Sequence, residues 1–110
     1  MLPWGRRYRR RGRPPKPRRI SDYPPGYIFA PFTPDGQLLL DNPIYMFPDE
    51  YEALRLTYYL GLTQEEASKR MGVSRGTFWR ILYSARRKLV QSLVERRPLI
   101  LTEQGPPLNV

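Results

Sequence analysis

Residues 62–89 place the strongest constraint on the fold of this chain, because they have the pattern of two helices joined by a tight turn. Residues 63–66 (TQEE) match a capping box, in which a threonine hydroxyl and a glutamate carboxylate accept bonds from backbone amides at a helix start. Gly72 suits the left-handed residue that ends such a helix, and Ser74 suits the cap of the next one. The pattern therefore predicts one helix that ends at Gly72 and a second that spans residues 75–95.

The second of these helices has a face of apolar side chains at steps of three and four residues, the spacing of a helix packed on a core. That face consists of Phe78, Ile81, Leu82, Ala85, Leu89 and Leu93. Ala67 and Met71 of the first helix are expected to pack against it, and Val73 is expected to hold the turn in the core. The two helices are thus predicted to share one apolar interior.

A further helix is predicted from Pro48 to Gly61, since proline is favoured in a first turn and glycine after a last one. Its apolar residues at helical spacing are Tyr51, Leu54, Leu56 and Tyr58. Glu50 and Glu52 resemble a pair of catalytic carboxylates, but acids near a helix start are favoured by the helix dipole, so a structural role is expected. Arg55 is expected to pair with an acid of this helix or the next.

Residues 20–47 are rich in proline, tyrosine and phenylalanine, which limits regular structure to short strands. Strands are predicted at Tyr27–Ala30 and Leu38–Leu40, on either side of the turn sequence TPDG at residues 33–36. A third strand is predicted at Leu99–Thr102, directly after the proline that stops the last helix.

Positive charge gathers in two places along a chain of net charge +9. Residues 1–19 carry nine Lys or Arg and no acid, and residues 75–97 carry seven bases against Glu95. Residues 20–47 carry three Asp and no base, and residues 48–74 are nearly balanced. A domain with this balance is expected to meet a polyanion, either a nucleic acid or an anionic membrane surface.

Several kinds of chemistry are excluded by composition. The chain has no cysteine and no histidine, so disulfides, thiolate catalysis, histidine bases and the usual zinc sites are absent. No metal, no cofactor and no enzymatic activity are expected, because the serines and lysines lack a convincing base partner. No apolar run approaches the roughly 18 residues that span a bilayer. We expect a cytoplasmic protein without membrane contact, at the nucleoid or the ribosome.

The chain divides into four parts by composition. Residues 1–19 form a basic extended arm, and residues 20–47 form the proline- and aromatic-rich segment with short strands. Residues 48–97 form the helical domain, and residues 98–110 a short strand with a frayed tail. The predicted fold is mainly α, a three-helix domain of the helix-turn-helix type with short β segments and a basic N-terminal arm.

These residues resemble a small, mostly archaeal and bacterial family of uncharacterised proteins that are predicted to bind DNA. The helix-turn-helix of that family is similar to region 4 of sigma factors, so a region-4-like or winged arrangement is implied. The resemblance covers roughly residues 14–104 and is carried by residues 17–19 (PRR), 29–31 (FAP), 49–56 (DEYEALRL) and 61–89. It implies DNA binding as the family's inferred role.

The resemblance also implies which side chains meet the nucleic acid. Arg75, Gly76, Trp79 and Arg80 would approach base edges, and Thr63, Gln64 and Ser74 would hold phosphates. Gly76 and Trp79 depart from the slender polar side chains usual in such readers. Trp79 is suited to stacking on a splayed base, touching a thymine methyl group, or packing on a partner. Outward residues of the second helix complete the predicted binding set on the helices: Thr77, Arg87 and Lys88.

The basic arm is a second predicted contact with nucleic acid, through Arg6, Arg7, Arg9, Arg10, Arg11, Arg13, Lys16, Arg18 and Arg19. Residues 11–14 (RGRP) resemble an AT-hook, which enters a narrow minor groove, although a general electrostatic tail accounts for the same composition. An arm threading through folded RNA is a further alternative. Five arm contacts with three from the helix predict a salt slope on the order of −7 on duplex DNA.

Two functions fit these features. The first is a DNA-binding transcription regulator, for which a homodimer gives a second half-site. The second is a structural RNA-binding protein of the ribosome or another ribonucleoprotein, expected to be a monomer. A solvated basic helix face is the alternative reading of the arginines on residues 75–88, and a dimer or arm contact is an alternative for Trp79 and Tyr83. Val90, Val94 and Leu99–Leu101 are the expected dimer contacts.

Overall fold

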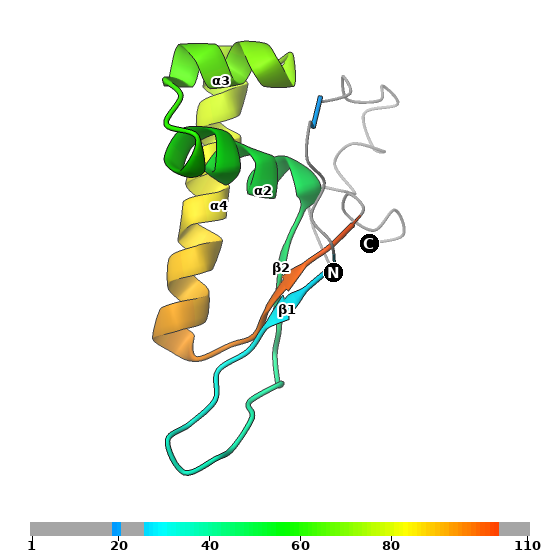
Figure 1. Ribbon diagram of the computed structural model, residues 1–110, viewed down its shortest axis with the longest axis vertical. Helices are drawn as coiled ribbons and strands as arrows, with labels where there is room; N and C mark the ends of the chain where they lie inside the picture. The colour runs from blue at the N-terminus through cyan, green and yellow to red at the C-terminus, as the bar shows by residue number, and fades with distance from the viewer. Residues whose placement is uncertain (1–18, 21–25, 104–110) are drawn as a thin grey trace.

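The computed structural model describes residues 19–20 and 26–103, in which helices pack against a small sheet (Figure 1). Helix α2 (Pro48–Leu54) continues into a π-helical turn, η1 (Arg55–Tyr59). Helix α3 (Gln64–Met71) and the long helix α4 (Arg75–Glu95) follow. Residues 1–18 of the arm predicted at 1–19, and the tail at 104–110, lie outside the described residues. No helix in the described part is long and apolar enough to cross a bilayer.

The last strand of the chain is the centre of the sheet. Strand β3 (Leu99–Leu101) pairs antiparallel with β1 (Ile28–Phe29) and parallel with β2 (Ile44–Met46), giving the order β1-β3-β2. Within residues 19–20 and 26–103, every helix lies in the connection between the parallel strands β2 and β3. The strands predicted at residues 27–30 and 99–102 are therefore confirmed within a residue or two.

The strand predicted at Leu38–Leu40 is wrong. The chain there forms a single bridge between Phe32 and Leu38 across the predicted turn, and no strand. The missing strand is β2, where Ile44 and Met46 are buried and Tyr45 between them is exposed. That alternation is the period-two signal of a half-buried strand, but only three residues carry it.

The helix boundaries follow the caps that the sequence contains. The Thr63 hydroxyl accepts from the Glu66 amide at 3.1 Å, and the Thr63 amide donates to the Glu66 carboxylate at 2.9 Å. Gly72 ends α3 in the left-handed region with φ of 69°, and the Ser74 hydroxyl caps α4 by accepting from the Thr77 amide. These starts and stops are confirmed because each depends on neighbouring residues alone.

The helix that begins at Pro48 changes register before its end. Over Arg55–Tyr59 its hydrogen bonds close five residues apart, as in the Leu60 amide bond to the Arg55 carbonyl at 2.9 Å. A π turn adds a residue to one helical turn, so it rotates the side chains that follow. Leu56 is fully buried as predicted, whereas Tyr58 is 57% exposed instead of facing the core.

The core consists of two adjoining clusters on the buried face of α4. The first joins the helices and contains Ala53, Leu56, Ala67, Met71, Phe78, Ile81 and Leu82. The second joins α4 to the sheet and contains Ile44, Met46, Ala85, Leu99 and Leu101. Leu99 and Leu101 are thus buried within the chain rather than available to a second copy.

The apolar stripe predicted on α4 is right for its first four residues and wrong for its last two. Leu89 is 40% exposed and Leu93 is 74% exposed, while Ser92 is buried in their place. Successive residues of a helix are about 100° apart, so Ser92 continues the buried face and Leu93 points away from it. The Ser92 hydroxyl donates to the Leu89 carbonyl at 2.8 Å, which satisfies it inside the helix.

Candidate nucleic-acid interface

Helices α3 and α4 are held together by a turn of three residues, Gly72, Val73 and Ser74. The Val73 amide donates to the Ser68 carbonyl at 3.1 Å, and the half-buried Val73 side chain packs on the first core cluster. Ala67 of α3 and Phe78 of α4 are both fully buried at the contact between the helices. The first turn of α4 is therefore rigidly placed at one end of the molecule, beside α3 (Figure 1).

The first turns of α4 expose basic side chains on the face opposite the core. Arg75, Trp79 and Arg80 are exposed, whereas Phe78 between them is buried. No acidic residue stands in the first turn of α4. Gly76 on the same exposed face has no heavy atom within 4 Å of the place that a Cβ would occupy. This end of α4 presents positive charge to the outside with open space beside it.

Trp79 is one half of an aromatic stack. Its ring and that of Tyr83 lie one helical turn apart, with centroids 5.2 Å apart and planes inclined by 11°. Both rings are about half exposed. Tyr83 was not in the predicted binding set, although the spacing of four residues was a signal that the two rings meet.

Thr77 has a smaller role than its place in the predicted set suggests. It is half-buried, and its hydroxyl accepts a bond of 3.0 Å from the capping Ser74 hydroxyl. The Arg80 guanidinium also donates to that hydroxyl, at 3.4 Å. Thr77 therefore orients Arg80 and the cap more than it offers itself to a ligand.

The start of α3 differs electrostatically from the start of α4. Thr63 and Gln64 are exposed, but Glu65 and Glu66 stand in the same turn. The bond from the Thr63 amide, with that from its side chain, lowers the pKa of Glu66 below its ordinary value. The carboxylate thus stays charged and occupies an amide that a phosphate would need. Of the two helix starts, α4 is the better anion site.

Lys88 is not on the outer surface with its neighbours. Its ammonium donates to the Glu50 carboxylate at 2.8 Å and to the Tyr45 carbonyl at 2.7 Å, and it lies 4.3 Å from the Phe47 ring centre. Its side chain is only 17% exposed. These contacts engage Lys88 within the fold and leave it partly buried, so its predicted contact with nucleic acid stays a prediction that this position does not favour. Arg87 remains exposed.

The predicted structural roles of the first-helix acids are as expected. The Glu50 carboxylate accepts from the Phe47 amide at 2.9 Å at the helix start and from the Ser84 hydroxyl at 2.6 Å. Glu52 is buried and pairs with Arg55 at 2.9 Å, which confirms the ion pair predicted for that arginine. The two carboxylates are therefore engaged in separate structural contacts.

Arg19 is the described residue of the basic arm that binds the helices. Its amide donates to the Met71 carbonyl at 3.0 Å, and its guanidinium donates to the carbonyls of Lys69 at 3.0 Å and Arg70 at 3.4 Å. A cation at a helix C-terminus is favoured by the helix dipole. The other arm residues of the predicted set lie outside the described residues: Arg6, Arg7, Arg9, Arg10, Arg11, Arg13, Lys16 and Arg18.

Arg19 also lies close to the α3–α4 turn. A Cβ at Gly72 would lie 3.1 Å from the Arg19 guanidinium, the far end of a flexible side chain that has room to shift, so the positive φ of Gly72 is the stronger reason for glycine there. In the described residues, no group of three or more acidic, cysteine or histidine side chains is placed to hold a metal ion.

Comparison with known proteins finds relatives that have no assigned activity. Residues 8–106 match the family described as "Protein of unknown function DUF134". A UPF0251 protein of Pyrococcus furiosus is 52% identical over 105 residues, which are 96% of this chain and 92% of that protein.

Other relatives match over a shorter part. A UPF0251 protein of Pyrococcus abyssi is 67% identical over 63 residues, 57% of each chain. One from Methanococcus maripaludis is 44% identical over 85 residues, 77% of this chain and 64% of that protein. No solved structure matches the chain.

Proposed function

We propose, for a chain that belongs to the family of proteins of unknown function DUF134, a non-enzymatic role in binding nucleic acid. Its most suitable target is duplex DNA, bound as by a transcription regulator. In this proposal α3 and α4 act as a helix-turn-helix, with α4 as the helix that enters the major groove.

The observation that carries the proposal is the first two turns of α4. Fully buried Phe78 and Leu82 fix these turns to the core, and Arg75 and Arg80 are exposed on a stretch of helix whose own sequence has no acid. The start of α4 also carries partial positive charge, which adds to the attraction for phosphates, although the Ser74 hydroxyl already occupies the Thr77 amide. Rigid support and unopposed positive charge are the two properties that a groove-reading helix needs.

The residues then divide by role. Arg75 and Arg80 are long enough to reach base edges or phosphates, and the exposed Arg87 two turns further along is placed for a phosphate. Ser74 keeps its hydroxyl on the Thr77 amide at 3.1 Å, so it supports the helix start. Lys88 does not belong to the surface.

A structural RNA-binding role is the second candidate, and the Trp79–Tyr83 stack favours it. Aromatic faces exposed on a basic surface are the usual platform for unpaired bases in RNA. The rings are 5.2 Å apart and about half exposed, so an incoming base can extend the stack.

The decisive experiment is recovery of nucleic acid crosslinked to the protein in cells, followed by sequencing. Intergenic DNA is expected under the first candidate, and ribosomal RNA under the second. Failure of the purified protein to bind duplexes and structured RNA at low ionic strength would end both.

Sequence reading by α4 is tested by Arg80→Ala. The variant is expected to lose about 1–3 kcal/mol of binding on a selected duplex and less on random duplex. Lys69→Ala removes the same charge from the exposed surface of α3 and is the matched control. Equal losses for Arg80→Ala on both duplexes would remove base reading from the proposal and leave phosphate contact.

A further inference from the structure

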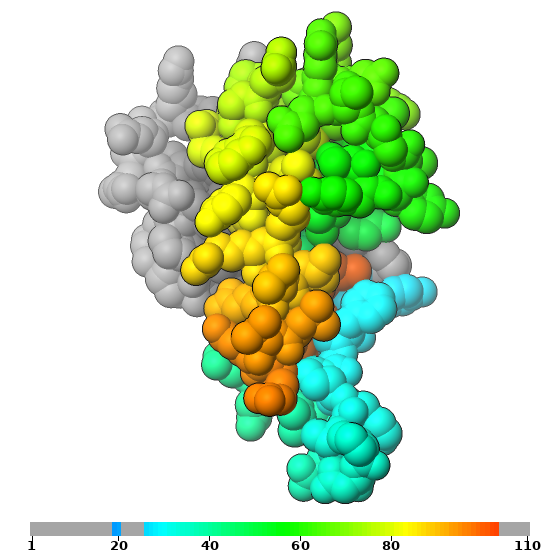
Figure 2. Space-filling view, turned by 90° about the vertical axis from the view of Figure 1, so that its left-hand side faces the viewer, coloured from blue at the N-terminus to red at the C-terminus, as the bar shows by residue number. Residues whose placement is uncertain are grey.

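An apolar groove of about 1060 Å³ lies beside the C-terminal half of α4. Leu89 and Leu93 of α4 line one side, Tyr58 and Tyr59 of η1 another, and Phe29 of β1 a third. Tyr59 is 82% exposed and Leu93 74% exposed, so the lining is open to the outside. Figure 2 shows the orange end of α4 beside the cyan segment that contains β1.

A loop of matching character projects from the same end of the molecule. Residues 31–41, here called the projecting loop, extend below the body in Figure 2. Phe32 is 69% exposed, and Leu38 and Leu40 are each more than half exposed. These apolar side chains are large for a loop, and more than half of each stays exposed to solvent in a single chain.

The projecting loop has its own internal order. The Thr33 amide donates to the Gln37 carbonyl at 2.8 Å, and the Leu39 amide donates to the Pro31 carbonyl at 3.0 Å. The Gln37 amide also donates to the Thr33 hydroxyl at 2.9 Å. Because its backbone is held by these bonds, the loop can enter a partner at little cost in ordering.

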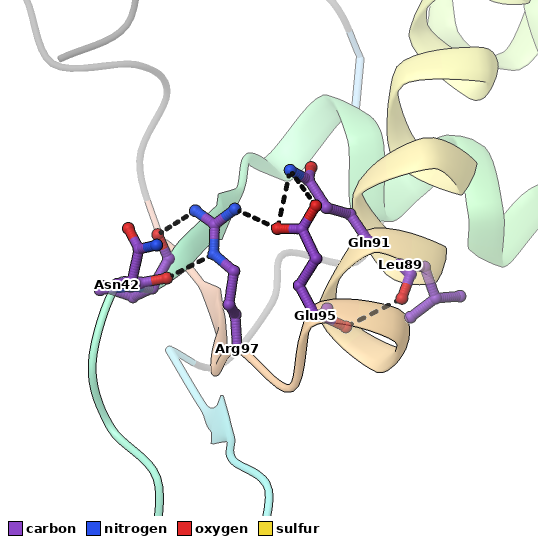
Figure 3. Close-up of polar contacts among 7 residues, drawn as sticks. Asn42, Leu89, Gln91, Glu95 and Arg97 are labelled. Atoms are coloured by element: carbon purple, nitrogen blue, oxygen red, sulfur yellow. Dashed lines mark hydrogen bonds and ion pairs between the residues drawn. The ribbon is translucent and has the colours of Figure 1, made fainter.

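Arg97 joins the loop to the groove. Its guanidinium donates to the Asn42 carbonyl at 2.6 Å, at the base of the loop, and to the Glu95 carboxylate at 2.8 Å, at the end of α4 (Figure 3). The Gln91 side chain donates to the same carboxylate at 3.3 Å. The end of α4 and the base of the loop are thus fixed relative to each other.

The charges of groove and loop are opposite. The groove lining includes Arg55, Arg96 and Arg97 and no acid. The projecting loop carries Asp35 and Asp41 and no base. Arg55 and Arg97 are paired with acids of their own chain, and Arg96 is exposed at the last turn of α4. An acidic, apolar loop is therefore a better occupant of this groove than a basic segment.

We propose that a second copy of this chain binds here, with the projecting loop of each copy in the groove of the other. Each chain carries both the groove and the projecting loop. In a dimer with a two-fold axis, both grooves and both loops are therefore occupied, and no binding surface is left for a third chain. This inference goes beyond the proposed nucleic-acid binding and does not depend on it.

The available area suits such a dimer. The exposed apolar side chains of the groove, strand β1 and the projecting loop are Ile28, Phe29, Phe32, Leu38, Leu40, Tyr58, Tyr59, Leu89 and Leu93. Since an aromatic side chain alone has roughly 150–250 Å², their exposed parts exceed the roughly 800 Å² that each partner of a standard interface contributes. Apolar patches of a typical monomer are smaller, at roughly 300–600 Å².

The test is the oligomeric state of the full chain, free of nucleic acid, by sedimentation in high salt. The parent is expected to be a dimer. Leu93→Glu and Phe32→Glu, one in the groove and one in the loop, are each expected to weaken the dimer by about 100-fold or more, because each places a charge in an apolar contact. Both residues are exposed in the single chain, so both variants are expected to fold.

Leu60→Glu is the matched control, since Leu60 is exposed but does not line the groove. It is expected to remain a dimer. A parent chain that sediments as a monomer at every attainable concentration overturns the proposal. The groove would then be a site for a small apolar ligand or for another protein. A dimer that survives Leu93→Glu and Phe32→Glu overturns it as well.

A charge exchange tests the pairing of loop with groove directly. Asp35→Arg and Arg96→Asp each place like charges together and are expected to weaken self-association. Mixing the two variants restores an opposite pair at both contacts of a mixed dimer, so dimer is expected to return. Absence of recovery in the mixture overturns the loop-in-groove arrangement. Asp35→Asn keeps an oxygen for the Thr33 hydroxyl and measures the effect of charge alone.

Discussion

The two halves of α4 share one buried face and differ on the other. From Arg75 to Lys88 the helix has five basic residues, two aromatic side chains stacked on its exposed face, and no acid. From Leu89 to Glu95 it has no base and exposes three of its four aliphatic side chains by more than half. The core thus dictates one side of a long helix, and the other side is free to present two surfaces of different chemistry.

The boundary between the halves falls within three adjacent bases. Arg86 donates to the Tyr58 hydroxyl at 2.9 Å, Arg87 is exposed, and Lys88 lies inside on Glu50. Three side chains of the same charge therefore make different contacts, because they point in different directions around the helix axis.

The largest effect is expected for Lys88→Ala. Glu50 is 4% exposed, and removal of its partner leaves a carboxylate buried without its cation. The free energy of unfolding is expected to fall by about 3 kcal/mol, measured by urea denaturation. Arg87→Ala is the control and is expected to change stability by less than about 0.5 kcal/mol. Equal losses in the two variants would mean that burial does not distinguish these neighbours.

A smaller effect is expected for Trp79→Ala, which removes one ring of the stack. Binding of single-stranded nucleic acid is expected to weaken by about 1–3 kcal/mol if a base stacks on this platform. Tyr83→Phe keeps the ring pair and is expected to bind as the parent does. The measurement is a fluorescence titration with a labelled oligonucleotide, and unchanged affinity in Trp79→Ala would assign the stack to a protein contact.

The sequence predicts the part of this helix that depends on local bonds. Ser74 and Gly72 mark a helix start and a helix end because each cap is made with residues only three or four positions away in the chain. Phe78 and Ala85 are recognised as core because several helical turns repeat the same spacing. The positive charge of the first turns of α4 is predicted from the sequence alone, because it requires only a count of arginines and acids.

The remainder depends on what the helix meets in space. Leu93 has the spacing of the core face, but Ser92 is the buried residue of that turn, and the groove lies where a core was expected. Lys88 has the composition of a surface residue, and its burial depends on Glu50, 38 residues away. The π turn at Arg55–Tyr59 has no composition that marks it, so the outward turn of Tyr58 was not predictable.

An intermediate change in salt dependence is expected for Arg87→Ala in the basic half. If Arg87 contacts one phosphate, the slope of log affinity against log salt on duplex DNA is expected to fall by about 0.9. The measurement is a series of binding isotherms at increasing salt. An unchanged slope would place Arg87 outside the contact and shorten the basic surface to the first two turns.

The smallest effect is expected from pH, and it involves one acid near each half. The pKa of Glu66 is lowered by bonds from Thr63, and that of Glu95 by the bond from Arg97. A lowered pKa means that the charged acid stabilises the fold above the ordinary value of 4.5 and that this contribution is lost as the pH falls through the lowered pKa.

The pH effect is measured as the free energy of unfolding below pH 4.5 in Glu66→Gln and Glu95→Gln. Each variant is expected to lose stability less steeply with acid than the parent, because glutamine does not titrate. Steeper loss in either variant would show that the sign of the shift is wrong.

Gly76 gives the exposed side of α4 an adjustable position. Gly76 is the second residue of α4, and no heavy atom beyond its own helix lies within 4 Å of the place that a Cβ would occupy. Replacement there thus meets no neighbouring atom, and, if α4 binds nucleic acid as proposed, a saturation library at this codon would vary the target that is bound while the fold stays constant.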